Sequence, residues 1–315
     1  MPVSEWRHTL TVVAVVTLLA GCTTDTGAGG DSGGHDPTIR ASAGDGSDHP
    51  LALFQGENLG LIDYAQLKLQ NQCLAKAGYP QNLNTMLSGP RAAFPGLVIT
   101  PRTFGPTTEQ EARRIGFGWD QPSEPPAVVS YDPNYDRALD DCAKQAWKRL
   151  GQDGQRIYFA YYDLGNNLSK SLMKTITERL DPQLPTKMLT CIRGKGYQPT
   201  DEQVFLKTPR PQLLGVRFGQ PDPGAGASWA PRKVPGTVQV GPAVAARQYH
   251  ATPEEGALAV AWLQCRQETT MAAQEMTAAV AVQKELVARY ETSFDELNPQ
   301  IKRLATQATA LIGAR

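Results

Sequence analysis

Apolar residues recur every three or four positions in several stretches of this chain, a spacing that predicts amphipathic helices. One stretch runs from Leu61 to Ala77, and Gly78 follows it where a glycine commonly ends a helix. Others run from Ala138 to Leu150, from Ile157 to Leu180 and from Leu184 to Ile192. The pattern therefore predicts a mainly helical protein.

The last predicted helix is the longest. After Pro253 no further proline occurs before residue 297, and beyond Gly256 no glycine does, while apolar positions alternate steps of four and three. Thr252 before Pro253 and two glutamates forms a good helix start. At a rise of 1.5 Å per residue, a single helix from 253 to 297 would be roughly 65 Å long.

This helix needs a partner for its apolar side. We expect it to pack antiparallel on the connecting helix, 155–182, within the same chain. Because that partner is shorter, we also expect the stretch 283–311, with Pro299 marking a break, to offer a surface for self-association or for another protein.

Short β-type runs bounded by proline and glycine lie between the helices. They cover residues 97–99, 127–129, 204–206 and 238–240. The predicted class is therefore mainly α with minor β.

An internal repeat organises the chain. Cys73 lies five residues before the dipeptide Gly78-Tyr79, and Cys191 lies five residues before Gly196-Tyr197. Each dipeptide precedes a proline-rich excursion that ends in a second cysteine on a helical pattern. Four features in the same order indicate duplication. We place repeat unit 1 at 51–154 and repeat unit 2, with the long C-terminal helix, at 183–315.

The first 22 residues have the form of an export signal. After a short polar head with Arg7, an uncharged apolar run extends from Thr9 to Ala20, too short to span a hydrocarbon core of about 30 Å. Leu-Ala-Gly-Cys at 19–22 resembles the lipobox of bacterial lipoproteins. That resemblance implies a signal peptide at 1–21, diacylglycerol on Cys22 and a place on the outer face of the cell membrane. The alternative is an ordinary secreted protein with a free Cys22.

Four cysteines remain when Cys22 is set aside. In an exported chain an even set favours disulfides over metal ligation or catalysis. Three connectivities exist, and the repeat selects Cys73 with Cys142 and Cys191 with Cys265. The fold then consists of two disulfide-stapled helical repeat units with proline-rich excursions and a long C-terminal helix.

The overall net charge of zero conceals an asymmetry. Residues 22–50 are rich in Gly, Asp, Ser and Thr, hold five Asp against Arg40, and form a predicted disordered tether. The body from 51 to 315 has 29 basic and 25 acidic residues. A balance so close to neutral argues against a nucleic-acid binder.

The sequence contains few residues suited to catalysis. His250 is the only histidine after residue 50, and neither a Gly-x-Ser-x-Gly nor a His-Glu-x-x-His motif occurs. We therefore expect no catalytic residue, no metal and no cofactor. Ser171 and Lys174 match the Ser-x-x-Lys spacing of penicillin-recognising enzymes, and the adjacent acids Glu254-Glu255 are interpreted as solvated charge.

Aromatic rings gather in the two proline-rich excursions. Most are expected to fill small cores, but Trp119 and Trp229 have proline and polar neighbours that favour exposure. Near them the related strings RRIGFGW and GVRFGQP contain Arg114 and Arg217. These two tryptophans and two arginines are the candidate binding residues.

With its Cys-x4-Gly-Tyr segments and the string TPEEGALAVAWLQCRQET, the chain resembles uncharacterised cell-surface lipoproteins of actinobacteria. The resemblance implies no activity. The hypothesis is a membrane-anchored extracytoplasmic binding or accessory module of an envelope system for efflux, resistance or wall assembly. The alternatives are an envelope enzyme such as a wall hydrolase, and a structural spacer.

Overall fold

The structure is a computed structural model, and it describes residues 49–86, 88–224 and 229–313. It is mainly helical with minor β structure, and it contains both predicted disulfides and a long C-terminal helix, so the predicted class is confirmed. Cys22 and nearly all of the predicted tether lie outside the described residues.

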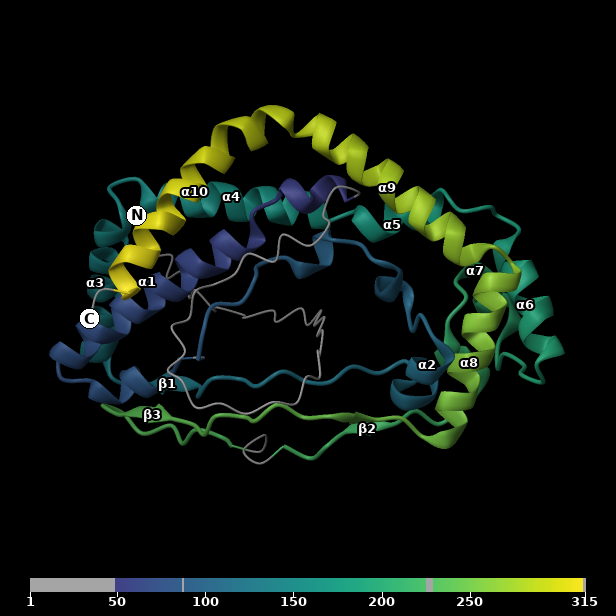
Figure 1. Ribbon diagram of the computed structural model, residues 1–315. Helices are drawn as coiled ribbons and strands as arrows, with labels where there is room; N and C mark the ends of the chain where they lie inside the picture. Colours follow the sequence, from purple (N-terminus) through teal and green to yellow (C-terminus); the bar gives the residue numbers. More distant parts are fainter. Residues whose placement is uncertain (1–48, 87, 225–228, 314–315) are drawn as a thin grey trace, which may run out of the picture.

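The elements form two lobes joined by two bridges, one above and one below in Figure 1. The longer helices are α1 (Gly56–Lys76), α3 (Pro133–Leu150), α4 (Gly154–Ser169), α6 (Leu184–Gly194), α8 (Pro253–Glu268), α9 (Met271–Arg289) and α10 (Glu291–Gly313). The shorter ones are α2 (Glu109–Ile115), α5 (Leu172–Glu178) and α7 (Glu202–Lys207). Single 3-10 turns are η2 (Pro50–Leu53), η3 (Pro80–Asn84), η4 (Pro95–Leu97), η5 (Pro101–Phe104) and η6 (Pro211–Leu214).

The first lobe is built from α1, α3, α4 and the end of α10. A disulfide between Cys73 and Cys142 joins α1 to α3, with 5.5 Å between the Cα atoms. Tyr161 is fully buried between these helices, and its hydroxyl donates to Oδ1 of Asn298 at 2.6 Å. The same hydroxyl accepts from the backbone N–H of Gln55 at 2.7 Å, so one polar group fixes three elements.

The second lobe holds α6, α7 and α8, with α2 packed on α8. Its disulfide joins Cys191 on α6 to Cys265 on α8, with 5.7 Å between the Cα atoms. Phe205 of α7 is fully buried in this smaller core.

The two cysteine-bearing helices that begin the repeats end alike. Gly78 and Gly196 have φ angles of 100° and 90°, a region that glycine adopts without strain. The next residue then donates back into the helix, Tyr79 N–H to the carbonyl of Leu74 at 2.9 Å and Tyr197 N–H to that of Ile192 at 3.1 Å. The repeated Gly-Tyr thus makes the same helix stop twice.

The upper bridge corrects one prediction. The helix expected from 253 to 297 is three helices, interrupted at Thr269–Thr270 and at Tyr290, and Thr270 has a φ of 61°. The predicted connecting helix is likewise divided, into α4 and α5. Packing within the chain is confirmed, because α9 lies on α5 and α10 on α4, running in the opposite direction (Figure 1).

The stretch 283–311 buries its apolar side within the chain. In α10 the buried residues Phe294, Ile301, Leu304, Ala305 and Ala308 belong to the core shared with α1 and α4. The apolar pattern that predicted a surface for another chain is therefore used to close the first lobe.

The lower bridge is an extended ribbon. Strand β1 (Val128–Ser130) pairs antiparallel with β3 (Val238–Val240), and β2 (Gln220–Pro221) pairs with β4 (Tyr249–His250). Two of the predicted β runs thus lie in β1 and β3. The other two predictions are wrong, since 97–99 begins on the last residue of the turn η4 and continues without strand structure, and 204–206 lies in α7, whose start Asp201 caps.

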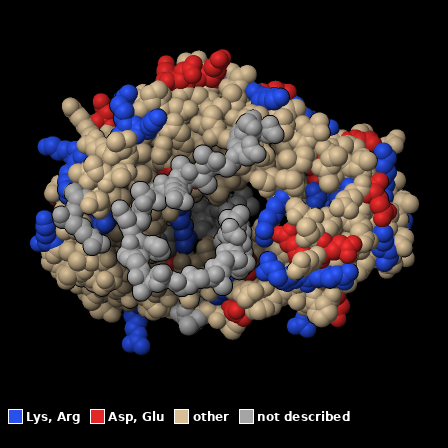
Figure 2. Space-filling view, in the orientation of Figure 1, with Lys and Arg blue, Asp and Glu red and all other residues tan. Residues whose placement is uncertain are grey.

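The repeats exchange elements. Strand β1 from the first half pairs with β3 from the second, and α10 from the second half packs on α1. The predicted boundaries therefore divide the sequence into two similar segments, and in the structure these two segments pack together into one body. Figure 2 shows that the face in view is hollowed at its centre.

Candidate binding site

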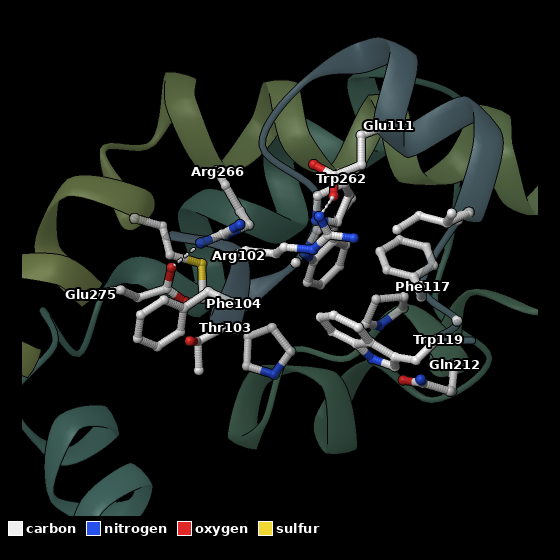
Figure 3. Close-up of a pocket in the computed structure, with 18 residues that line it drawn as sticks. Arg102, Thr103, Phe104, Glu111, Phe117, Trp119, Gln212, Trp262, Arg266 and Glu275 are labelled. Atoms are coloured by element: carbon white, nitrogen blue, oxygen red, sulfur yellow. Dashed lines mark hydrogen bonds and ion pairs between the residues drawn. The ribbon is translucent and has the colours of Figure 1, made fainter. Parts of the chain in front are cut away.

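A pocket of about 280 Å³ lies in the second lobe, where the first proline-rich excursion reaches α8 (Figure 3). We call it the Arg102 pocket. One wall comes from η5 and the segment after α2, another from α8 and α9, and a third from the turn at η6. The lining includes Arg102, Phe104, Glu111, Trp119, Arg266 and Glu275.

Two ion pairs lie in this pocket. Nη1 of Arg102 is 3.1 Å from Oε1 of Glu111, and Arg266 donates to Glu275. Arg266 and Glu275 are both buried, and this burial raises the pKa of Glu275 although Arg266 opposes the shift. The side chain of Arg102, in contrast, is 39% exposed.

The helix break at Thr270 makes the buried pair possible. Arg266 and Glu275 are nine residues apart, which on a straight helix would separate them by about 13 Å along the axis. The left-handed conformation of Thr270 turns the chain between α8 and α9 and brings the two side chains together. The interruption therefore has a direct role in shaping the pocket.

Aromatic rings lie beside both guanidinium groups. The Cζ atom of Arg102 is 5.8 Å from the ring centre of Trp119, and that of Arg266 is 5.9 Å from the ring centre of Phe104. Figure 3 shows the Arg102 guanidinium between Glu111 and Trp119. Cations at such distances are attracted to the faces of aromatic rings, and Trp119 remains 38% exposed.

Several buried polar atoms of this pocket have unused hydrogen-bonding capacity. Within the described part of the chain, neither Nε of Arg102 nor Nε of Arg266 has a hydrogen-bond partner. Oε1 of Glu111 makes its ion-pair contact with Arg102 but no hydrogen bond of good geometry. Each unsatisfied buried group costs about 1–3 kcal/mol. Such a concentration in one place marks the pocket as the candidate site.

A buried carboxylate, that of Glu255, holds together three segments of chain next to the pocket. Glu255 accepts hydrogen bonds from the N–H of Phe117 at 2.8 Å, the N–H of Gly219 at 2.7 Å and the hydroxyl of Tyr249 at 3.0 Å. Burial raises the pKa of Tyr249 to about 12, and the hydrogen bond to Glu255 and the negative charge of that carboxylate add to this shift. The interpretation of Glu254-Glu255 as solvated charge is thus correct for Glu254, which is exposed, and wrong for Glu255.

The same contacts explain the two glycines that flank Phe117. A Cβ on Gly116, whose φ is 56°, would lie 2.4 Å from Oε1 of Glu255, and one on Gly118 would lie 2.1 Å from the ring of Tyr249. Close approach to Glu255 and Tyr249 therefore accounts for these glycines.

Of the predicted binding residues, Trp119 lines the pocket and the other three do not. Arg114 and Arg217 are exposed, whereas Trp229 is half-buried and lies against Gly241. The residues that sequence reasoning missed are Arg102, Phe104, Glu111, Arg266 and Glu275. One signal was available, since Arg266 follows Cys265 on a helix face that is otherwise apolar.

The residues considered for catalysis are not brought together. Ser171 is exposed before α5, and Nζ of Lys174 pairs with Glu178 at 3.1 Å. His250 is exposed on β4, with Nε2 2.9 Å from Oδ1 of Asp222. Across residues 49–313, apart from the undescribed gaps, no cluster of His, Cys, Asp and Glu is suited to hold a metal ion. None of the described helices has the length and hydrophobicity needed to cross a bilayer.

The chain was also compared with known protein families, with curated proteins and with solved structures, and none of these comparisons found a match.

Proposed function

We propose that this protein is a lipoprotein, anchored through Cys22 to the outer face of the cell membrane, that binds a small ligand in the Arg102 pocket. The ligand would combine a flat apolar part with an acidic group. Such a binding module would serve an envelope system for efflux, resistance or wall assembly.

One observation carries the ligand class. Arg102 is partly exposed, lies over the ring of a partly exposed tryptophan and makes only one ion pair within the described residues, so its guanidinium has N–H donors to spare. A carboxylate or phosphate accepts from such a planar group in charge-assisted hydrogen bonds. A flat ring next to the acid would lie against Trp119. The volume of about 280 Å³ fits a small organic molecule.

The ligand class is tested by calorimetric titration with benzoate, benzamide and cyclohexanecarboxylate. Benzoate should bind most tightly, because benzamide lacks the charge and cyclohexanecarboxylate lacks the flat ring. Arg102→Gln should weaken benzoate binding by at least about tenfold. Arg114→Gln is the matched control, since Arg114 is exposed and lies outside the pocket. Equal affinity for the three compounds, or equal loss in the two variants, would contradict the proposal.

Anchoring is tested separately. A single acyl chain binds membranes only marginally, whereas two chains hold a protein stably. Cys22→Ser should therefore move the protein from the membrane fraction to the soluble fraction, measured by fractionation and mass spectrometry of the N-terminal peptide. An unmodified Cys22 in the membrane-associated wild-type protein would refute this part.

A further inference from the structure

A second pocket, of about 500 Å³, lies in the first lobe and shares no residue with the Arg102 pocket. We call it the Asn82 pocket. Helix α1 forms one side, α3 and β1 form another, and Asn82, Thr85, Met86 and the segment 89–91 complete it. The residues that matter here are Leu67, Gln70, Asn71, Asn82, Val128 and Tyr135.

The floor of this pocket is polar but uncharged. Gln70, Asn71 and Asn82 are all buried there. Nδ2 of Asn82 donates to the hydroxyl of Tyr135 at 2.7 Å, and Nδ2 of Asn71 donates to Oγ1 of Thr85 at 3.3 Å. These bonds fix the orientation of two amides.

Hydrogen-bonding capacity remains unused on this floor. Oδ1 of Asn82 is completely buried and has no partner in the described part of the chain. Among the described residues, nothing donates to Oδ1 of Asn71, and Nε2 of Gln70 donates to none. Of these groups, Oδ1 of Asn71 and Nε2 of Gln70 offer a ligand an acceptor and a donor. A hydroxyl group, which donates and accepts at once, matches such a mixture better than an ion does.

The walls and the rim narrow the ligand class further. The side walls are apolar, with Leu67, Val128 and Leu139 beside the rings of Tyr64 and Tyr135. At the rim, Asp63 and Asp136 face a single cation among the lining residues, Arg91, which already donates to the carbonyl of Ser123 at 2.6 Å. An anionic ligand would meet excess negative charge, whereas a neutral ligand would not.

The position of the pocket in the repeat supports its being a site. Leu139 and Trp262 each stand three residues before the second cysteine of their repeat, and each lines the pocket of its own lobe. Each lobe thus contains a pocket, one with charged and aromatic groups and one with amides.

We propose that the Asn82 pocket binds a neutral saccharide. Sugar hydroxyls would bond to the amides of the floor, and the apolar C–H face of a pyranose ring would lie against the tyrosines and Leu67. This site is additional to the Arg102 pocket, and neither proposal depends on the other.

The test is titration of the ¹⁵N-labelled protein with N,N′-diacetylchitobiose, which carries amide and hydroxyl groups, and with maltose, which carries hydroxyl groups only. Shifts in amide resonances are expected in α1, η3 and β1. Leu67→Trp should fill the mouth of the pocket and weaken binding by at least about tenfold. Leu83→Trp is the matched control, because Leu83 is 51% exposed and Leu67 is 42% exposed, yet Leu83 lies outside the pocket.

Loss in Leu67→Trp with retention in Leu83→Trp would support the site, provided that both variants keep the wild-type far-UV circular dichroism. The proposal would be overturned if neither saccharide shifted any amide resonance at about 10 mM, a concentration that fills weak sites. Unchanged affinity in Leu67→Trp would also overturn it. Arg102→Gln should leave saccharide binding intact, which keeps this result separate from the benzoate test.

Discussion

Glu255 shows how much one residue can organise. In the described structure no Lys or Arg pairs with its carboxylate, yet the side chain is fully buried. Two backbone N–H groups, from distant segments of the chain, and one tyrosine hydroxyl replace the water it has lost. A buried carboxylate with such partners is compatible with stability because every donor aimed at it is used.

Glu255→Ala should destabilise the protein by about 3 kcal/mol, because it leaves the N–H groups of Phe117 and Gly219 buried without acceptors. Urea unfolding followed by circular dichroism measures the change in the free energy of unfolding. Glu254→Ala is the control, since Glu254 is the preceding residue and is exposed. A similar small loss in both variants would show that the Glu255 contacts contribute little.

At the scale of elements, the sequence predicted what local periodicity determines. The cysteine-bearing helices and the glycine stops of α1 and α6 follow from spacing within short segments, and the repeat selects the cysteine pairs; the structure contains all of them. The break at Thr270 was missed because neither glycine nor proline marks it. It accompanies the buried contact between Arg266 and Glu275, which only the folded chain forms.

The Arg102 pocket was only partly predictable for the same reason. The polar neighbours of Trp119 predicted its exposure. Arg102 and Glu275 lie 173 residues apart, and nothing in the sequence around either residue predicts that they share a pocket. Runs of three apolar residues were equally ambiguous. Residues 204–206 read as a strand, but Asp201 accepts from the N–H of Val204 at 3.0 Å and starts a helix.

At the scale of the whole molecule, the two repeats depend on each other. The ribbon pairs β1 with β3, α2 packs on α8, and α10 completes the core beside α1. Neither half encloses its apolar surface alone, so the halves should share one folding equilibrium.

We therefore expect a single calorimetric transition for the oxidised protein, with equal calorimetric and van't Hoff enthalpies. The ribbon is best perturbed at Gln239, which lies opposite Val129 in the middle of β3. Gln239→Pro should lower the midpoint of the whole transition, because proline removes a backbone donor from the pairing.

Gln239→Ala is the control for this variant, since it removes the side-chain bond to the N–H of Arg232 and keeps the backbone donor. Its midpoint should fall less than that of Gln239→Pro. Two resolved transitions, only one of which moves in the proline variant, would indicate independent halves.

The order of the cysteines has a consequence for how the molecule matures. Each disulfide joins consecutive cysteines, Cys73 with Cys142 and Cys191 with Cys265. If the chain enters an oxidising compartment amino terminus first, as the anchoring proposal requires, each thiol meets its correct partner before a later competitor emerges. Oxidation in order of arrival then gives the native pairing without reshuffling. The core of the first lobe nevertheless contains residues of α10, the last helix to enter the compartment, so this core is complete only after α10 has arrived.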